Sequence, residues 1–288
     1  MTRSNAQGRA LESLIVTELL SLPNNTLTPR AQSAQSRDAN AIASLTPTLR
    51  ESMRSAGGKT CRWLQSLPVY STDLAVTIDR ASDQSGGTAD LIITLGTSKV
   101  PLSVKHNHGA LKHQRPYSLV KWFAGSASKD RSHRSRLGAR CDNFRRHAGR
   151  AANFSAVPAA KDVLLREVCH DCVLTLTAIR TRSASAAELF AFLTGGRIYR
   201  LLVKTDAAGR LSSVSVEDFH GLAKPSSFRV SYQQGARNSH GLCICFNNSC
   251  DIRMRLHTAS SRISSSGQLS LKFDTSFVSH RRIPTVVL

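Results

Sequence analysis

Residues 89–105, Ala-Asp-Leu-Ile-Ile-Thr-Leu-Gly-Thr-Ser-Lys-Val-Pro-Leu-Ser-Val-Lys, are the stretch of sequence that decides the fold. Two apolar runs flank the turn residues 96–98, which is typical of a β-hairpin. The second run, residues 99–105, alternates apolar and polar side chains, so its apolar side chains are expected on one face of a sheet. Residues 74–79 alternate in the same way. We therefore predict consecutive strands separated by turns in this part of the chain.

The remaining segments complete a pattern of mixed helices and strands. Apolar residues recur at helical spacing from Leu11 to Leu22, which predicts an N-terminal helix. Residues 23–50 are polar, and we interpret them as a loop followed by a weak helix. Residues 106–122 are expected to be helical at least from Gly109, with Pro116 kinking or restarting the helix. Residues 164–193 are expected to form a helix or mixed structure. Six short strands are expected after them, over residues 198–204, 211–216, 228–232, 242–246, 252–257 and 269–273.

The composition is that of a globular protein with an excess of positive charge. Of its 288 residues 41% are hydrophobic, which is enough for one large core or two small ones and argues against a disordered chain. Lys and Arg number 39 against 19 Asp and Glu, giving a formal net charge of +20 and a pI near 10.6. A field of this sign favours a polyanion, most often nucleic acid, with a membrane surface as the alternative. Nine of the positive residues lie between Lys121 and Arg150, where each is either a phosphate contact or a solvated charge.

Membrane, export and disulfide signals are weak in this sequence. No run of about 18 apolar residues exists, which argues against an integral membrane protein. Glu12 and Glu18 interrupt the most apolar early stretch, which makes a poor signal peptide, so we expect a cytoplasmic location. Seven cysteines without an export signal fit free thiols better than a disulfide framework. A structural zinc site remains an alternative, although the spacing is not that of paired knuckles. Its candidate thiols are those of Cys169, Cys172, Cys243, Cys245 and Cys250.

An acid and a lysine fall on neighbouring predicted strands. Asp90 lies at the start of the first strand of the hairpin and Lys105 at the end of the second. A carboxylate can hold Mg²⁺, the metal polarises a phosphate and acidifies water, and an ammonium orients the nucleophile or stabilises the transition state. The pair therefore predicts metal-assisted phosphodiester hydrolysis. The alternative is that Asp90 is only a turn residue near the start of a strand.

Glu12 is an unusual residue on the apolar face of the N-terminal helix. On a helical wheel it falls between Ile15 and Leu19 on one side and Val16 on the other. An unpaired carboxylate is costly to bury, so a function for Glu12 is one interpretation. The other is a carboxylate at the flank of the helix that extends to water.

Five separated segments resemble type II restriction endonucleases of the HaeIII kind. They span the chain from end to end, and they are Asn5–Glu12, Gly87–Asp90, Ser103–Arg115, Arg255–Ser261 and Leu269–Asp274. Such enzymes belong to the PD-(D/E)XK nuclease superfamily. The resemblance implies an α/β or α+β fold, with a mixed β-sheet flanked by helices and the acids and lysine near the sheet edge. It further implies a nuclease core over residues 1–160 and a strand-rich part with DNA-recognition elements over 161–288, unless the two form one continuous domain.

The resemblance also implies the catalytic residues. Asp90 matches the first acid of the family motif and Lys105 its lysine. Ser103 stands where a second acid is expected, and serine supplies no carboxylate. Some members of the superfamily take a carboxylate from the first core helix, so Glu12 is the matching candidate, and Mg²⁺ would be held by Asp90 and Glu12. If Glu12 is not the ligand, Asp79 and Asp83 are the next candidates.

The activity implied by the resemblance is Mg²⁺-dependent hydrolysis of double-stranded DNA at a short palindrome of the GGCC type. A companion DNA methyltransferase would protect the host, and a palindrome makes a homodimer a natural solution. Guanines offer O6 and N7 to arginine and lysine. The alternative is a non-catalytic nucleic-acid-binding protein descended from a nuclease. The expected DNA-binding residues are Lys112, Arg115, Arg253, Arg255, Arg262 and Lys272.

Overall fold

Two compact units make up the chain in a computed structural model that describes residues 3–81, 89–111, 114–120, 127–179, 183–233, 240–279 and 283–288. Unit 1 consists of Met1–Gly109, Gly195–Leu222 and Ile283–Leu288. Unit 2 consists of Ala110–Thr194 and Ala223–Arg282. Each unit contains both helices and strands, so the expected mixed α and β fold is confirmed.

The centre of unit 1 is a seven-stranded mixed sheet with strand order β1-β2-β3-β4-β5-β6-β11. Strands β2, β3 and β4 pair antiparallel in succession, and β4 then pairs parallel with β5. The predicted hairpin is β3 and β4. The strands of the sheet are β1 (Asn25–Leu27), β2 (Val76–Arg80), β3 (Leu91–Leu95), β4 (Ser98–His106), β5 (Tyr199–Thr205), β6 (Leu211–Asp218) and β11 (Thr285–Val287).

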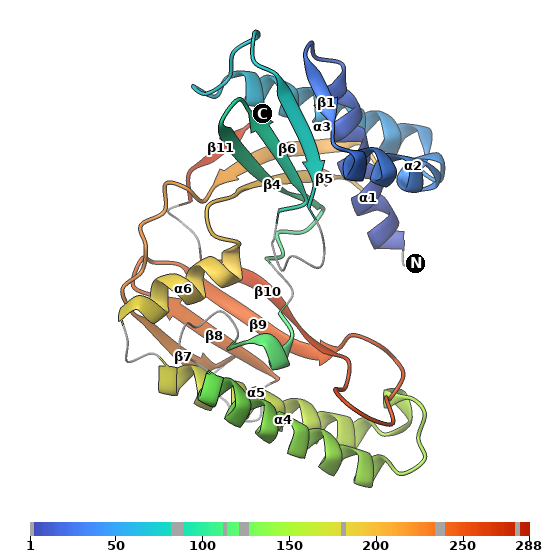
Figure 1. The fold of residues 1–288 in the computed structure, drawn as a ribbon. Coiled ribbons are helices and arrows are strands. Elements are labelled where there is room, and N and C mark those ends of the chain that lie inside the picture. The colour runs from blue at the N-terminus through green and yellow to red at the C-terminus, as the bar shows by residue number, and fades with distance from the viewer. Residues whose placement is uncertain are drawn as a thin grey trace. The chain divides into compact units, whose positions relative to one another are not determined.

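Three helices pack against this sheet (Figure 1): α1 (Arg3–Leu20), α2 (Pro29–Ala43) and α3 (Pro47–Gln65). The apolar face predicted for the first helix is confirmed, because its leucines and valine lie in one core with the inward residues of β2 to β6. Within residues 23–50 the expected helix is confirmed, but the loop before it is wrong, because β1 occupies 25–27 and α2 already begins at Pro29. Thr28 and Thr46 cap α2 and α3 by accepting bonds from the amides of Ala31 and Leu49, and a proline follows each cap.

Unit 2 combines a four-stranded antiparallel sheet, order β10-β9-β8-β7, with three helices. Its strands are β7 (Phe228–Tyr232), β8 (Gly241–Phe246), β9 (Asp251–Thr258) and β10 (Leu271–Ser279). Helix α5 (Pro158–Ile179) packs against β7, β8 and β9, and α4 (Ala127–Ala148) packs against α5 (Figure 1). Helix α6 (Ser183–Thr194) and two short 3₁₀ helices, η2 (Pro116–Ser118) and η3 (Phe154–Ala156), complete the unit. No helix in the described ranges combines the length and the apolar character needed to cross a bilayer.

The helix expected over residues 106–122 is wrong in the part that the structure describes. Strand β4 continues through His106, and Asn107 takes a positive φ of 58° that ends the strand. Ala110 then forms a β-bridge with Ser276, and the Leu111 amide donates to the Thr275 carbonyl oxygen. The segment therefore hydrogen-bonds to β10 instead of to itself. Only η2 is helical there.

The expected boundary near residue 160 does not coincide with the observed division into units. Strands β5 and β6 follow that boundary in sequence but pair within the N-terminal sheet, because β5 lies beside β4. Strand β11 joins the same sheet from the C-terminus. The strand-rich C-terminal part is thus divided between the two units.

Candidate active site

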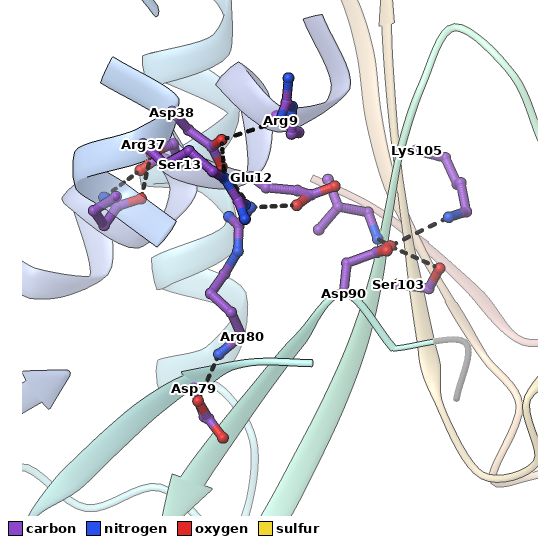
Figure 2. Close-up of polar contacts among 12 residues, drawn as sticks. Arg9, Glu12, Ser13, Arg37, Asp38, Asp79, Arg80, Asp90, Ser103 and Lys105 are labelled. Atoms are coloured by element: carbon purple, nitrogen blue, oxygen red, sulfur yellow. Dashed lines mark hydrogen bonds and ion pairs between the residues drawn. The ribbon is translucent and has the colours of Figure 1, made fainter. Parts of the chain in front are cut away.

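Asp90 lies at the start of β3, where hydrogen bonds to β4 fix its position. Its amide donates to the Leu102 carbonyl oxygen at 2.9 Å, next to the first pair of the ladder, Leu91 with Leu102. Its Oδ2 accepts bonds from the Val104 amide at 2.7 Å and the Ser103 hydroxyl at 3.1 Å. The same oxygen is 3.2 Å from Nζ of Lys105 (Figure 2). The structure therefore brings the predicted acid, lysine and serine together.

This cluster lies at the ends of two interior strands of the sheet. Strands β3 and β4 occupy the third and fourth places of seven, so the expected position near the sheet edge is wrong. Ser103 is buried and acts as a hydrogen-bond donor to Asp90. It cannot supply the carboxylate of the family motif.

Glu12 extends from α1 to the same place. Its Oε2 is 2.7 Å from Nη2 of Arg80, and its side chain is 17% exposed. In Figure 2 the Glu12 carboxylate lies between Arg80 and Asp90. Burial raises the pKa of Glu12 to about 7, and repulsion from Asp90 adds to this effect, while Arg80 and Lys105 oppose it. The alternative of a carboxylate extended into water is therefore wrong.

Arg80 and Asp38 are site residues that sequence reasoning missed. Arg80 ends β2 with its side chain 7% exposed, and its Nη2 also lies 3.0 Å from Oδ2 of Asp38, which is fully buried. Arg9 and Arg37 approach the same carboxylate at 3.6 and 3.1 Å. The signal for Arg80 was present, since the alternation of β2 places residues 76, 78 and 80 on its buried side. An inward arginine requires a buried partner.

The reserve candidates for the second acid are less suitable. Asp79 accepts hydrogen bonds from Thr28 at 2.6 Å and from Nε of Arg30 at 3.1 Å. Burial raises the pKa of Asp79, but the bonds from Arg30 and Thr28 outweigh burial and hold this pKa below its ordinary value. Its carboxylate is thus already used between β2 and α2. Asp83 lies outside the described residues.

The donor set fits a magnesium ion. Glu12 Oε1 and Asp90 Oδ1 make no hydrogen bond to any described residue. Magnesium prefers oxygen ligands and is usually held by one or two carboxylates plus water and substrate phosphates. Glu12 and Asp90 together meet that requirement.

The expected DNA-binding residues lie in unit 2, whereas the four catalytic candidates lie in unit 1. Arg253 and Arg255 are exposed on β9, and Lys272 is half-buried on the neighbouring β10. Arg262 is exposed in the loop after β9, and Arg115 is exposed just before η2. Lys112 lies outside the described residues.

The zinc alternative has little support in unit 2. Cys169 and Cys172 are buried in α5, and burial raises the pKa of the Cys169 thiol to about 12. Cys243 and Cys245 lie on β8, and burial raises the pKa of both thiols. Across the described ranges, no three or more His, Cys, Asp or Glu side chains are grouped so that they could hold a metal.

Comparison of the sequence with protein-family models and with curated proteins finds no match. The resemblance to restriction endonucleases therefore rests on the five segments of sequence alone.

Proposed function

We propose that this protein is a Mg²⁺-dependent type II restriction endonuclease that hydrolyses double-stranded DNA at a short palindrome, with GGCC as the first site to test. The observation that carries the proposal is the meeting of Asp90, Lys105 and Glu12 from three separate elements of unit 1. Two carboxylates beside an ammonium are a suitable arrangement for metal-assisted phosphodiester hydrolysis. The formal charge of +20 supports a polyanionic substrate.

Each residue has a distinct part in the proposed reaction. Glu12 and Asp90 would hold the cation, which when bound supplies charge that polarises the phosphate and acidifies water. Lys105, held by Asp90, places its ammonium where it can donate to a phosphate oxygen and stabilise the negative charge of the transition state. Ser103 and the Val104 amide orient Asp90 by donating to its Oδ2. A homodimer would suit the twofold symmetry of a palindrome, and a companion methyltransferase would protect host DNA.

Incubation of the purified chain with plasmid DNA, with and without Mg²⁺, tests the proposal. We expect discrete fragments with Mg²⁺ and none with a chelator. Lys105→Met and Asp90→Asn should each reduce the cleavage rate by at least a hundredfold, because each removes charge from the reacting centre. The matched controls are Lys99→Met on the same strand and Asp73→Asn in an exposed loop, both expected to cut at the wild-type rate.

The outcome decides between the nuclease and its alternative. Binding of duplex DNA without cleavage under any divalent cation would support the non-catalytic nucleic-acid-binding protein instead. Cleavage by Asp90→Asn at the wild-type rate would remove Asp90 from the site. Digestion into random fragments would support a nuclease activity but contradict cleavage at a specific site.

A further inference from the structure

The outward face of the sheet in unit 2 carries cations that form no ion pair with any described carboxylate. We define the arginine face as the side chains of Arg229, Arg253, Arg255 and Lys272. None of them lies within ion-pair distance of a carboxylate among the described residues. Arg229, Arg253 and Arg255 are exposed, and the residues that alternate with them on β9 are buried. A group of unpaired cations on one surface is the electrostatic signature of a polyanion-binding face.

The opposite face of this sheet is closed by helices. Phe190 of α6 meets Phe246 of β8 edge to face, with ring centroids 5.1 Å apart. His170 of α5 stacks on Tyr232 of β7. Ile252, Met254 and the other inward residues are buried. The helices that pack on the sheet therefore leave the arginine face uncovered in the described part of unit 2.

Two acidic side chains, Asp251 and Asp274, lie beside the arginine face, and each interacts with a neighbouring residue. His257 lies 3.0 Å from the Asp274 carboxylate, and Cys245 donates a hydrogen bond to Asp251. Four cations against these two acids leave the face positive. Unit 2 as a whole carries 24 Lys and Arg against 8 Asp and Glu, a formal +16, whereas unit 1 carries 15 against 11, a formal +4. The excess charge of the molecule is thus concentrated in the unit that bears this face.

The basic helix α4 differs from the arginine face because its charges are largely used within unit 2. Arg134 pairs with Asp130 at 2.7 Å, and Arg140 pairs with Asp171 at 3.0 Å. Arg145 pairs with Asp142 and donates to backbone carbonyl oxygens after β9. These arginines stabilise the fold around α4. They are less available for phosphate than the sequence suggests.

We infer that the arginine face docks the sugar–phosphate backbone of duplex DNA and does not read its bases. Three strand spacings of about 4.8 Å separate the outer strands of the sheet by about 14 Å. The major groove is about 12 Å wide and admits a two-stranded ribbon, so this sheet is too wide to enter it. Arg253 and Arg255, two residues apart on β9, project about 7 Å from each other and can contact successive phosphates.

The lack of large aromatic side chains favours a duplex over a single strand. Single-strand binding proteins stack bases on aromatic rings. The described outward positions of β7 to β10 are occupied by arginine, lysine, histidine, serine, cysteine, aspartate, glycine and valine, without Phe, Tyr or Trp. Such a face offers charge and hydrogen bonds but no stacking platform. The inference rests on the proposed function only in taking DNA as the polyanion.

The test compares two double variants that remove the same charge from unit 2. Arg253→Gln with Arg255→Gln alters the arginine face, and Arg134→Gln with Arg166→Gln removes two arginines that pair with Asp130 and Asp162. Both are made in the Asp90→Asn background and assayed without metal by fluorescence anisotropy, using a GGCC duplex, a duplex lacking GGCC and a single strand. Binding is measured from 50 to 200 mM salt, and thermal unfolding checks that each variant is folded.

We expect the arginine-face variant to reduce the slope of log K against log salt by about 2, since each phosphate contact contributes about 0.9. Both duplexes should lose affinity equally, by at least tenfold at 0.15 M salt, and the paired-arginine control should lose much less. Equal losses of affinity in the two double variants would show that only the net charge of the protein matters, and this would overturn the inference. A loss confined to the GGCC duplex, or tighter binding of the single strand, would also overturn it.

The same measurements separate this inference from the proposed function. If the wild-type chain never cleaves DNA but the arginine-face variant shows the expected loss, the endonuclease proposal fails and the docking surface stands. If the wild type cleaves DNA and the arginine-face variant binds as tightly as its background, the docking surface fails alone. A chain that binds no duplex DNA would overturn both.

Discussion

Arg80 forms ion pairs with two carboxylates of the candidate site, and this geometry determines what its removal should do. Glu12 and Asp38 would both remain in a nearly dry environment without their shared cation. Breaking a buried pair from one side typically costs about 3–5 kcal/mol. We therefore expect Arg80→Met to lower the free energy of unfolding by about 3 kcal/mol in urea denaturation. Arg62→Met, on the exposed side of α3, should change it by less than about 0.5 kcal/mol.

Glu12→Gln is the most selective test of the second acid. Glutamine is nearly isosteric and preserves helix propensity, so the protein should fold. It removes the charge that a cation needs, so we expect weak metal binding, intact duplex binding and at least a hundredfold slower cleavage in Mg²⁺. Calorimetric titration with Mg²⁺ and a plasmid digest measure these effects.

Ser103→Glu in the Glu12→Gln background is the complementary variant. It returns a carboxylate to the strand position whose hydroxyl bonds to Asp90 and should restore part of the activity. Wild-type cleavage by Glu12→Gln alone would show that the ligand from α1 is wrong.

At the scale of residues, the sequence identified three side chains that meet, but not all of the contacts that hold them. Asp90 and Lys105 follow from strand alternation, and Glu12 follows from its place on an apolar helical face. Arg80 was missed because a strand that ends before a polar loop suggests solvent exposure. The partner that stabilises Glu12 is a residue 68 positions later in the chain, and spacing along one element carries no information about such a pair.

At the scale of elements, two adjacent glycines of α3 have opposite roles. A Cβ on Gly57 would lie 2.6 Å from Cγ of Glu18 and 3.4 Å from Cα of Ile15, both on α1. A Cβ on Gly58 would meet only the end of Arg62 at 3.9 Å. We expect Gly57→Ala to destabilise the protein by about 1–3 kcal/mol through overpacking. Gly58→Ala should stabilise it by up to about 1 kcal/mol through helix propensity.

Chemical denaturation of the two glycine variants measures this difference. Because α1 carries Glu12, Gly57→Ala should also weaken Mg²⁺ binding, whereas Gly58→Ala should not. Equal stability of the two variants would show that α1 and α3 do not approach as closely as the contact at Gly57 indicates.

His133 joins three elements and predicts a pH dependence. His133 lies on α4. Its Nδ1 hydrogen-bonds to the Thr175 hydroxyl of α5 at 2.9 Å, and its Nε2 hydrogen-bonds to the Pro116 carbonyl oxygen of η2 at 2.9 Å. Burial lowers the pKa of His133 below its ordinary value of 6.5; nearby Arg136 also lowers it, while the bond to Pro116 and the carboxylates of Asp171 and Asp130 oppose this shift. The unfolded chain therefore takes up the proton first as pH falls below about 6.5, so this contribution to stability is lost in acid.

We expect wild-type stability to fall more steeply between pH 6.5 and 5 than that of His133→Asn. Urea denaturation at several pH values measures both slopes, and their difference isolates His133 from other titrating groups. Parallel curves would assign the acid sensitivity elsewhere. His147→Asn, exposed on the same helix, is the matched control and should follow the wild type.

Most strands could be predicted at this scale. The starts of α2 and α3 and the segment after His106 were missed. The alternation of 74–79 and of 99–105, with the apolar run 89–95 between them, identified β2, β4 and β3 to within a few residues. The Thr-Pro pairs that begin α2 and α3 are start signals that could have been read from the sequence. The segment after His106 was misassigned because its partner, β10, lies more than 150 residues later in the chain.

At the scale of the whole molecule, charge and chemistry are divided between two units. The formal +16 lies in unit 2, and the carboxylate pair lies in unit 1. The sequence predicted the total charge but not this division, because the chain leaves unit 1 after Gly109 and returns to it at Gly195. The pairing of β5 with β4 shows that the later segment belongs to the first unit.

This division predicts how salt should affect the reaction. Affinity carried by phosphate contacts falls with a slope of about 0.9 per contact, so the four cations of the arginine face alone predict a slope of about −4 for log K against log salt. Between 50 and 200 mM salt at fixed Mg²⁺, cleavage at limiting protein should therefore fall by more than a hundredfold. The rate at saturating protein should change far less, because the closely held Glu12, Asp90 and Lys105 are poorly screened by salt. Single-turnover digests at both protein concentrations measure the two effects. An equal loss at both concentrations would place the salt-sensitive charges at the reacting centre and would contradict the division of binding and chemistry between the units.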